Sequence, residues 1–301
     1  MTERVQIVEV GPRDGLQNES VILSTEHKID MILRLAGAGL TRIETVSFAH
    51  PDKVPQMADA EAVMEGLPQR DDISYIGLIL NWRGWRRAVD TAVDEINMNV
   101  SASNTFNQRN QGSNTDETID VLGQVVRDAS AAGIPVTATI ATSWGCPFEG
   151  EIPIERLVLV ANAVSETGVS EIALADTIGV ADPWSVTERI NAVRQSVDDI
   201  PLRAHFHNTR NTGIANAYAA VLAGVTTLDS SVGGLGGCPF APNATGNIPT
   251  DDLVYMLERA GIATGVSLEE IIAVSRFMEP LVGKPLEAMM PKAGVFPQPP
   301  S

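Results

Sequence analysis

Short apolar runs rich in Val, Ile and Thr alternate along the chain with longer stretches in which apolar and polar residues repeat with a helical period. A bounded run of about four to eight such residues is typical of a buried strand, and a longer amphipathic stretch is typical of a helix that packs one face on a sheet. The predicted strands are residues 5–10, 42–48, 73–80, 95–101, 135–142, 171–176, 202–207 and 226–232. The predicted helices are residues 25–38, 54–66, 83–93, 116–132, 154–167, 183–197, 212–223 and 250–260.

Eight strand–helix units in about 260 residues match the size of a (β/α)₈ TIM barrel, so this is the predicted fold. A doubly wound open sheet is the alternative. It is disfavoured because Gly11–Gly15, after the first predicted strand, is not the phosphate-binding glycine pattern of that fold. We therefore expect one domain over residues 1–301, with the barrel at about 5–262 and an added helical segment at about 266–290.

The acidic composition narrows the partners that the protein can bind. The 301 residues include 38 Asp and Glu against 21 Lys and Arg, which gives a net charge of −17. Binding to nucleic acid or to an anionic membrane surface depends on clustered basic residues, so neither partner is expected. The sequence shows no membrane-spanning run and no secretory signal, and its two cysteines do not form a disulfide framework. We expect a cytoplasmic protein.

Residues capable of acid–base and metal chemistry gather where the predicted strands end. In a TIM barrel, the carboxyl ends of the strands and the loops after them hold the active site. The residues at these positions are Arg13 and Asp14 after the first strand, Glu44 in the second, Asp176 at the end of the sixth, His205 and His207 at the end of the seventh, and Cys238 and Asn247 after the eighth. The pattern predicts one active site at this end of the barrel.

The pair His205 and His207 indicates a metal site. Residues i and i+2 of a strand face the same way, here the barrel interior, and the chain has only four histidines. The alternative is two core histidines satisfied by hydrogen bonds. Asp14 and Asn247 can add oxygen ligands, and a mixed nitrogen and oxygen set without thiolate favours Mg²⁺ or Mn²⁺ over structural zinc. Asp14 is alternatively a turn residue before Gly15.

Lysine and cysteine usage also bears on the chemistry. None of the four lysines falls in a predicted strand, so a Schiff-base lysine is disfavoured and a metal is expected to polarise the substrate. Cys238 lies in the glycine-rich run VGGLGGCPF at residues 232–240. Glycine is used where the backbone bends through positive φ or approaches a ligand closely, which favours a thiol held toward a substrate. A small, packed thiol is the alternative.

Seven motifs follow one another along the chain. They are residues 8–19 (VEVGPRDGLQNE), 43–48 (IETVSF), 54–59 (VPQMAD), 145–150 (GCPFEG), 176–179 (DTIG), 205–208 (HFHN) and 233–247. Together they resemble the hydroxymethylglutaryl-CoA lyase family, from about Val5 to Leu286, and the Gly-Gly-Cys-Pro loop separates this family from the related condensing synthases. The resemblance implies a homodimeric enzyme that cleaves a 3-hydroxy-3-methylglutaryl-CoA-like thioester to acetyl-CoA and acetoacetate.

The resemblance also implies roles for residues at the barrel mouth. Asp14, His205, His207 and Asn247 would hold Mg²⁺ or Mn²⁺, and Asp14 or His205 would take the proton of the substrate hydroxyl. Arg13 would stabilise the enolate, and Cys238 would protonate it. Glu44 and Asp176 would orient Arg13 or shuttle protons. The residues implied to contact the substrate are Arg13, Gln17, Gly236 and Gly237. Glu44 and Asp176 are alternatively structural ion-pair partners.

Several positions depart from the family pattern, including residues 79–82, which lack the usual Pro before Asn81, and residues 208–210, which follow the histidine pair. Ser20 stands in place of a common Lys, Asn104 in place of a Glu, and His50 in place of a small residue. Another branched 3-hydroxyacyl-CoA, or citramalyl-CoA, is therefore the alternative substrate. Two hypotheses compete with a thioester lyase: a condensing synthase or 2-oxo-acid aldolase on the same barrel, and a catalytically silent scaffold.

Overall fold

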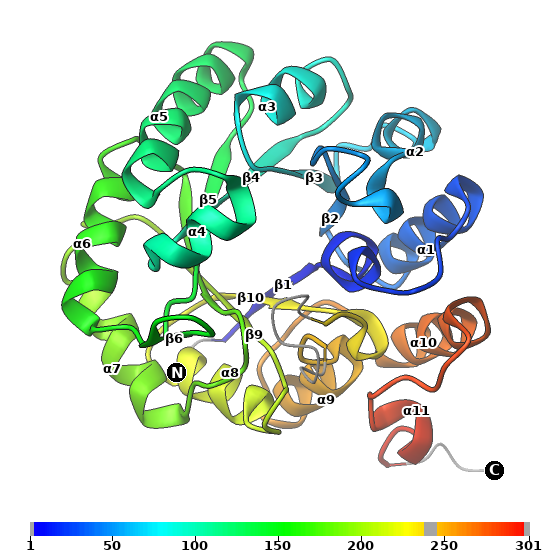
Figure 1. Ribbon diagram of the computed structural model, residues 1–301. Coiled ribbons are helices and arrows are strands. Elements are labelled where there is room, and N and C mark those ends of the chain that lie inside the picture. The colour runs from blue at the N-terminus through cyan, green and yellow to red at the C-terminus, as the bar shows by residue number, and fades with distance from the viewer. Residues whose placement is uncertain (1–2, 238–245, 298–301) are drawn as a thin grey trace.

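The strands close into a parallel barrel, which confirms the predicted TIM-barrel fold (Figure 1). The computed structural model describes residues 3–237 and 246–297. The strands pair in the order β1-β10-β9-β8-β5-β4-β3-β2, and β2 pairs again with β1. Their bounds are β1 (Gln6–Glu9), β2 (Arg42–Ser47), β3 (Ser74–Ile79), β4 (Glu95–Ser101), β5 (Val136–Ala141), β8 (Glu171–Asp176), β9 (Leu202–Phe206) and β10 (Thr227–Ser230).

A helix follows each barrel strand and lies outside the barrel (Figure 1). These helices are α1 (Thr25–Gly37), α2 (Ala60–Gly66), α3 (Trp82–Ala88), α5 (Thr115–Ala132), α6 (Ile154–Ser165), α7 (Pro183–Arg194), α8 (Gly213–Leu222) and α9 (Thr250–Arg259). Polar side chains fix where several of them begin. Ser24 accepts the backbone N–H of His27, and Asn114 forms a capping box with Glu117.

The structure also contains elements that the hydrophobic period does not mark. They are the π-helix η1 (Gly11–Gly15), the 3₁₀ helices η2 (Pro55–Met57) and η3 (Val232–Gly234), α4 (Asn104–Gln111), the hairpin of β6 (Gly145–Cys146) and β7 (Gly150–Glu151), and α11 (Met290–Ala293). The α4 sequence is mostly polar and buries Phe106 and Asn107, so it has no apolar stripe to recognise.

Two predicted helices differ from the structure in extent. The first half of the predicted helix 54–66 is wrong, because Pro55–Met57 forms a 3₁₀ turn and α2 begins only at Ala60. The predicted helix 83–93 ends early, at Ala88. Val93 is buried two residues before β4 begins, so the chain must leave the helix to enter that strand.

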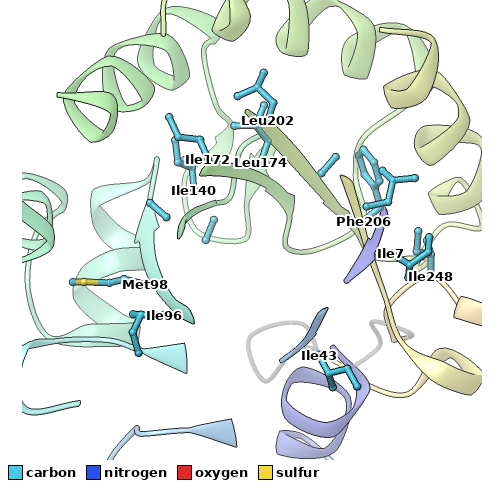
Figure 2. Packing of buried hydrophobic residues seen from close by; sticks show 14 of the residues in the cluster. Ile7, Ile43, Ile96, Met98, Ile140, Ile172, Leu174, Leu202, Phe206 and Ile248 are labelled. Atoms are coloured by element: carbon cyan, nitrogen blue, oxygen red, sulfur yellow. The ribbon is translucent and has the colours of Figure 1, made fainter. Parts of the chain in front are cut away.

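Alternate residues of each strand face the two sides of the barrel wall. On β4, Ile96 and Met98 are fully buried in the apolar layer between strands and helices, together with residues such as Ile140 and Ile172 (Figure 2). Burial of such side chains contributes roughly 1.5–3 kcal/mol each. Polar residues at the intervening positions are thereby directed into the barrel.

The barrel interior is crossed by a network of charged residues. The Arg42 guanidinium lies 2.6 Å from Glu95 Oε1 and 2.9 Å from Glu171 Oε2. Arg203, only 1% exposed, lies 3.6 Å from Glu171 and 3.3 Å from Asp229. Charges buried in pairs avoid most of the cost that an isolated buried charge carries. The network links β2, β4, β8, β9 and β10 across the interior.

The C-terminal segment packs beside the start of the chain. Helix α10 (Leu268–Val282) lies next to α1 and α9 (Figure 1). The Ser267 N–H donates to the Ala38 carbonyl at 2.8 Å, and the Ala288 N–H donates to the Gly233 carbonyl at 3.1 Å. The added helix predicted within 266–290 is therefore present and touches the segment that follows β10. No helix in the described ranges is long and apolar enough to cross a bilayer.

We expect Arg42→Met to lower the free energy of unfolding by about 3–5 kcal/mol, because it leaves Glu95 without its guanidinium partner inside the barrel. Urea unfolding followed by circular dichroism measures the loss. Arg70→Met is the matched control: Arg70 pairs with Asp72 at the exposed surface, where such pairs contribute about 1 kcal/mol or less. Equal losses in the two variants would contradict the stabilising role of the interior network.

Candidate active site

The predicted site residues converge at the carboxyl end of the barrel. Arg13 and Asp14 lie in η1, directly after β1. His205 lies in β9, and His207 follows it by two residues. The backbone of residues 246–248 pairs with that of 206–208, through hydrogen bonds from Asn208 N–H to the Gly246 carbonyl (3.1 Å) and from Ile248 N–H to the Phe206 carbonyl (3.1 Å). This pairing places Asn247 opposite His207.

The π-helical turn after β1 directs three N–H groups to one carbonyl. The N–H groups of Arg13, Asp14 and Gly15 all donate to the Val10 carbonyl, at 3.2, 2.7 and 3.1 Å. A side chain at position 15 would meet the Leu235 side chain at 2.9 Å, so Gly15 allows the chain after β10 to pack directly on η1. The same turn therefore presents Arg13 and Asp14 to the barrel mouth and holds them close to the loop that contains Asn247.

Asp14, His205 and His207 form a compact cluster of buried metal-ligating groups. The Nε2 atoms of both histidines lie 3.9 Å from Asp14 Oδ2, and one ligand atom from each residue lies within 4.8 Å of the others. The two imidazole rings are 5.2 Å apart between centroids. One carboxylate and two imidazoles are a donor set that suits a divalent metal ion.

Ionisation of Asp14 and His207 also suits a cation, whereas burial acts to lower the pKa of His205 but Asp229 and Asp14 raise it. Burial acts to raise the pKa of Asp14, but Arg13, the two histidines and Asn247 together lower it to about 2. Burial, assisted by His205, lowers the pKa of His207 to about 4. Near neutral pH, Asp14 is therefore a carboxylate and His207 is a neutral imidazole, which are the forms that bind metals.

Asn247 lies beside this cluster. Its Nδ2 donates to Asp14 Oδ2 at 3.0 Å and to the Leu235 carbonyl at 3.1 Å. Its side-chain oxygen is buried and has no hydrogen-bond partner among the described residues. A buried unpaired oxygen carries a cost that a ligand can remove, so this atom is available to a cation.

Arg13 is held on both sides by carboxylates. Its Nε donates to Glu44 Oε2 at 2.7 Å and its Nη1 to Asp14 Oδ1 at 2.6 Å. The other oxygen of Glu44 accepts from Asn97 Nδ2 at 2.7 Å, which fixes the carboxylate in turn. Burial disfavours the charged guanidinium, yet Glu44 and Asp14 raise the pKa of Arg13 above its usual value. The result is a fixed positive charge next to the metal-ligating cluster.

Asp229 was not predicted from the sequence, although it contacts a predicted ligand. Its Oδ2 lies 3.1 Å from His205 Nδ1, on the side of the ring opposite the Nε2 that faces Asp14. Arg203 lies 3.3 Å from its other oxygen, and the pKa of Asp229 is lowered by Arg203 and His205 against the effect of burial. A carboxylate on one ring nitrogen orients the other toward a metal. The sequence feature that could have identified Asp229 is an acidic residue at an inward-facing position of the eighth barrel strand.

Asp176 ends β8 but makes its hydrogen bonds to the chain that follows it. Its two oxygens accept the N–H groups of Val180 and Ala181, both at 2.9 Å. Burial raises its pKa, against these hydrogen bonds and the charge of His205. The structure therefore brings Glu44, but not Asp176, into hydrogen bonds with Arg13.

The remaining predicted substrate contacts lie around Asp14 and Asn247. Gln17 Nε2 donates to Asp14 Oδ1 at 3.3 Å, and Asn18 Nδ2 donates to the Gly237 carbonyl at 3.1 Å. Gly236 has a φ of 129°, and a Cβ there would meet Asn247 Nδ2 at 2.7 Å, so this close approach requires glycine. Cys238 lies outside the described residues.

A large cavity opens from this cluster. It has a volume of about 1250 Å³, and Arg13, Asp14, His205 and His207 are among the residues that line it. Its lining also includes polar residues of β4 and β5 (Asn97, Asn99 and Thr139) and basic residues of the surrounding helices and loops (Lys53, Arg83, Arg87 and Arg109). The cavity therefore joins the metal-ligating cluster to a basic rim.

Three of the departures from the family pattern occupy different surroundings. His50 lines the cavity. Asn104 accepts the N–H of Thr115 at 3.0 Å and so joins α4 to α5. Ser20 is exposed. Only His50 of these three is placed to contact a bound molecule directly.

Comparisons with known proteins agree with this geometry. The family model described as HMGL-like matches residues 4–278. The chain is 42% identical to the hydroxymethylglutaryl-CoA lyase of Bacillus subtilis, over 94% of this chain and 95% of that protein. It is 37% identical to the (R)-citramalyl-CoA lyase of Chloroflexus aurantiacus, over 98% and 97% of the two chains.

Solved structures give the same result. The fold matches an HMG-CoA lyase from Acinetobacter baumannii in complex with coenzyme A and 3-methylmalate with a TM-score of 0.95, and the Bacillus subtilis HMG-CoA lyase with a TM-score of 0.94. The Acinetobacter protein is 38% identical, and the match covers 99% of this chain and 98% of that chain. The resemblance predicted from the motifs is thereby confirmed: the chain belongs to the HMGL-like family.

Proposed function

We propose that this protein is a divalent-metal-dependent carbon–carbon lyase that cleaves a 3-hydroxy-3-methylglutaryl-CoA-like thioester to acetyl-CoA and acetoacetate. The observation that carries the proposal is the cluster of Asp14, His205 and His207 beside Arg13 in a cavity of about 1250 Å³. This combination offers both a cation site and a fixed positive charge at one place, and the HMG-CoA lyase and citramalyl-CoA lyase relatives support the reaction class.

Asp14, His205, His207 and Asn247 are the residues that would hold Mg²⁺ or Mn²⁺. The buried, unpaired oxygen of Asn247 and the ionised carboxylate of Asp14 fit such an ion. An ion bound there supplies Lewis-acid polarisation of the hydroxyl and carbonyl oxygens of the substrate. Asp14 and His205 are the two groups placed to accept the proton of the tertiary hydroxyl.

Arg13 stabilises the thioester enolate in this proposal. That negative charge exists only once the carbon–carbon bond begins to break, and a fixed charge aimed at developing charge accelerates a reaction most. Glu44 holds the guanidinium in place through Nε, and Asn97 holds Glu44. The arginine therefore needs little rearrangement when the enolate forms.

Cys238 is the proposed general acid that protonates the enolate to give acetyl-CoA. A thiol has a pKa only modestly above neutrality, which suits proton donation near pH 7. The preceding residue, Gly237, lines the cavity. Asp176 is proposed to act near His205, either in a proton shuttle or as a structural carboxyl that holds the turn at Val180 and Ala181.

The outer part of the cavity suits the coenzyme A part of an acyl-CoA thioester. Lys53 and Arg83 are exposed and line the cavity on the side of β2 and β3. Cationic side chains of this kind bind phosphate groups through charge-assisted hydrogen bonds.

We also infer one domain for residues 1–301, because α10 packs against α1 and α9. The homodimer and the cytoplasmic location stay predictions.

A citramalyl-CoA or another branched 3-hydroxyacyl-CoA is the second candidate substrate. The inner wall of the cavity carries the side chains of Asn97, Asn99 and Thr139, and Asn99 Oδ1 has no hydrogen-bond partner among the described residues. Neutral polar groups of this kind can hydrogen-bond the hydroxyl and carboxylate oxygens of a shorter branched acyl group as well as those of a hydroxymethylglutaryl group. The citramalyl-CoA lyase relative supports the same substrate.

The substrate assay follows acetyl-CoA formation from a panel of 3-hydroxyacyl thioesters, including 3-hydroxy-3-methylglutaryl-CoA and both citramalyl-CoA enantiomers, with added Mn²⁺. We expect cleavage that EDTA abolishes and that Mg²⁺ or Mn²⁺ restores. Release of free CoA from acetyl-CoA and a 2-oxo acid, without any cleavage, would instead indicate a condensing synthase. Failure to bind either metal would favour a silent scaffold.

Arg13→Gln is expected to fold normally and to lower kcat by about 10²–10³-fold, because it removes the charge that stabilises the enolate. Cys238→Ser should likewise fold and lose most of its turnover, since a serine hydroxyl is a much weaker acid. Steady-state kinetics at saturating Mn²⁺, with circular dichroism as the check on folding, measures both. Full activity of Cys238→Ser would exclude the thiol as proton donor.

Asp229→Asn is expected to weaken Mn²⁺ binding by about 10–100-fold, because a neutral amide is a weaker acceptor for His205 Nδ1 than the carboxylate and leaves the ring a poorer metal ligand. Calorimetric titration of the purified protein with Mn²⁺ measures the change. Glu171→Gln is the control, since Glu171 lies in the same interior network and contacts Arg42 and Arg203 rather than a histidine. Similar metal affinities of the two variants would argue against the role of Asp229.

A further inference from the structure

Two fully buried carboxyl groups lie behind the active site. Glu9 is the last residue of β1, and Asp251 lies in the first turn of α9. Both side chains belong to residues that are 0% exposed. Neither is among the residues that line the cavity, and neither has a role in the proposed reaction. Most of their hydrogen bonds go instead to the chain segments before Asp14 and on either side of the loop that contains Asn247.

Glu9 joins three of these segments. Its Oε1 accepts the Gly11 N–H at 2.8 Å and the Val232 N–H at 2.9 Å. Its Oε2 lies 2.7 Å from the hydroxyl of Thr250. Gly11 begins the turn that presents Asp14, Val232 begins the chain after β10, and Thr250 follows Asn247 by three residues.

Asp251 holds the next residue along the same chain. Its Oδ2 accepts the Gly233 N–H at 2.7 Å, and its Oδ1 accepts from the Ser275 hydroxyl of α10 at 2.6 Å. Gly233 has a φ of 67°, and a side chain there would collide with Leu286, so the position needs glycine. Consecutive residues at the start of this loop therefore donate to two different buried carboxyl groups.

Both ends of the loop are fixed to each other as well. The Ser231 N–H donates to the Ile248 carbonyl and the Thr250 N–H donates to the Ser231 carbonyl, each at 3.0 Å. Residues 231 and 248–250 thus form a closed stem, which we call the β10 stem. Asn247 is adjacent to this stem and is bonded to Asp14 at 3.0 Å, so a shift of the stem relative to η1 changes the distance between these two residues.

We propose that Glu9 and Asp251 are positioning residues that set the metal affinity by fixing the β10 stem, and with it Asn247, against Asp14. The inference rests on the proposed metal site but not on the identity of the substrate. The chain after β10 is also in close contact with η1, since a Cβ at Gly15 would lie only 2.9 Å from the Leu235 side chain. This close packing leaves the β10 stem little room to shift relative to η1.

The protonation state of Glu9 explains which substitution can replace it. Burial raises the pKa of Glu9 to about 8, against the hydrogen bonds that it accepts and with a further increase from the charge of Asp251. The carboxyl is therefore mostly neutral near pH 7. A glutamine can make the same contacts, since its oxygen accepts the two N–H groups and its amide donates to the Thr250 hydroxyl.

The test is calorimetric titration with Mn²⁺, without substrate, of the full chain and of two variants at position 9. Glu9→Met keeps the length of the side chain but cannot accept the two N–H groups, and we expect it to weaken Mn²⁺ binding by about tenfold or more. Glu9→Gln should restore the affinity to within about threefold of the original. Equal Mn²⁺ affinity in Glu9→Met and the unmodified protein would overturn the proposal.

Glu95→Gln is the matched control. Glu95 is also a buried carboxyl of the barrel, but it pairs with Arg42, away from the β10 stem. We expect its thermal stability to fall while its Mn²⁺ affinity stays unchanged. If Glu95→Gln weakened Mn²⁺ binding as much as Glu9→Met, general loss of stability would explain both results and the positioning role would be rejected.

A second variant covers the case in which Glu9→Met does not fold. Thr250→Val removes only the hydroxyl that contacts Glu9 Oε2, and we expect it to weaken Mn²⁺ binding by about threefold or more. Unchanged affinity in Thr250→Val would then overturn the proposal. If the unmodified protein bound no Mn²⁺, the proposed function itself would fail. If the unmodified protein bound Mn²⁺ and the variants bound it equally well, only the positioning role would fail.

Discussion

The arrangement of the active site depends on one buried carboxylate, that of Asp14. An ionised group cannot be buried without compensation, since moving a charge from water into a protein interior is costly unless it is paired and hydrogen-bonded. Arg13 and Asn247 supply that compensation at 2.6 and 3.0 Å, and the two histidines lie 3.9 Å away. The chain segments after β1, β9 and β10 must therefore meet at this point. A divalent cation would add the remaining positive charge.

The barrel makes this convergence possible because it connects the site to a rigid interior. Asp229 faces His205 on one side and Arg203 on the other. Arg203 also approaches Glu171, which pairs with Arg42. A continuous series of charged contacts thus runs from His205 to the opposite end of the barrel. Orientation of the imidazole follows from the strands themselves and not only from the loops that follow them.

Much of this arrangement could be predicted from the sequence, for a physical reason. Strands alternate the direction of their side chains, so His205 and His207 had to face the same way. Parallel strands in a barrel bring their carboxyl ends together, so Arg13, Asp14 and the histidines had to meet. These predictions use only the spacing of residues within a strand and the topology of the fold. Both can be inferred from the pattern of apolar runs along the chain.

The parts that could not be predicted depend on contacts between distant residues. Asp229 and Glu9 are single acids in their strands, and nothing in the local sequence states that one contacts a histidine and the other two backbone N–H groups and the Thr250 hydroxyl. Helix α4 escapes detection because its polar sequence is stabilised by the Ser103 cap and by contacts with neighbouring segments. The predicted orientation of Arg13 by Asp176 has no such contact, since that carboxyl is occupied by backbone N–H groups.

Glu9 and Asp14 show why residue type alone does not predict the protonation state or the role of a buried acid. The two acids are five positions apart and both are buried, yet the pKa of Glu9 is raised to about 8 and that of Asp14 is lowered to about 2. Glu9 faces neutral donors and another carboxyl, so burial dominates, whereas Asp14 faces a guanidinium and two imidazoles. One acid is thereby suited to hold backbone as a neutral group, and the other to bind a cation. The division follows from the groups that each side chain contacts.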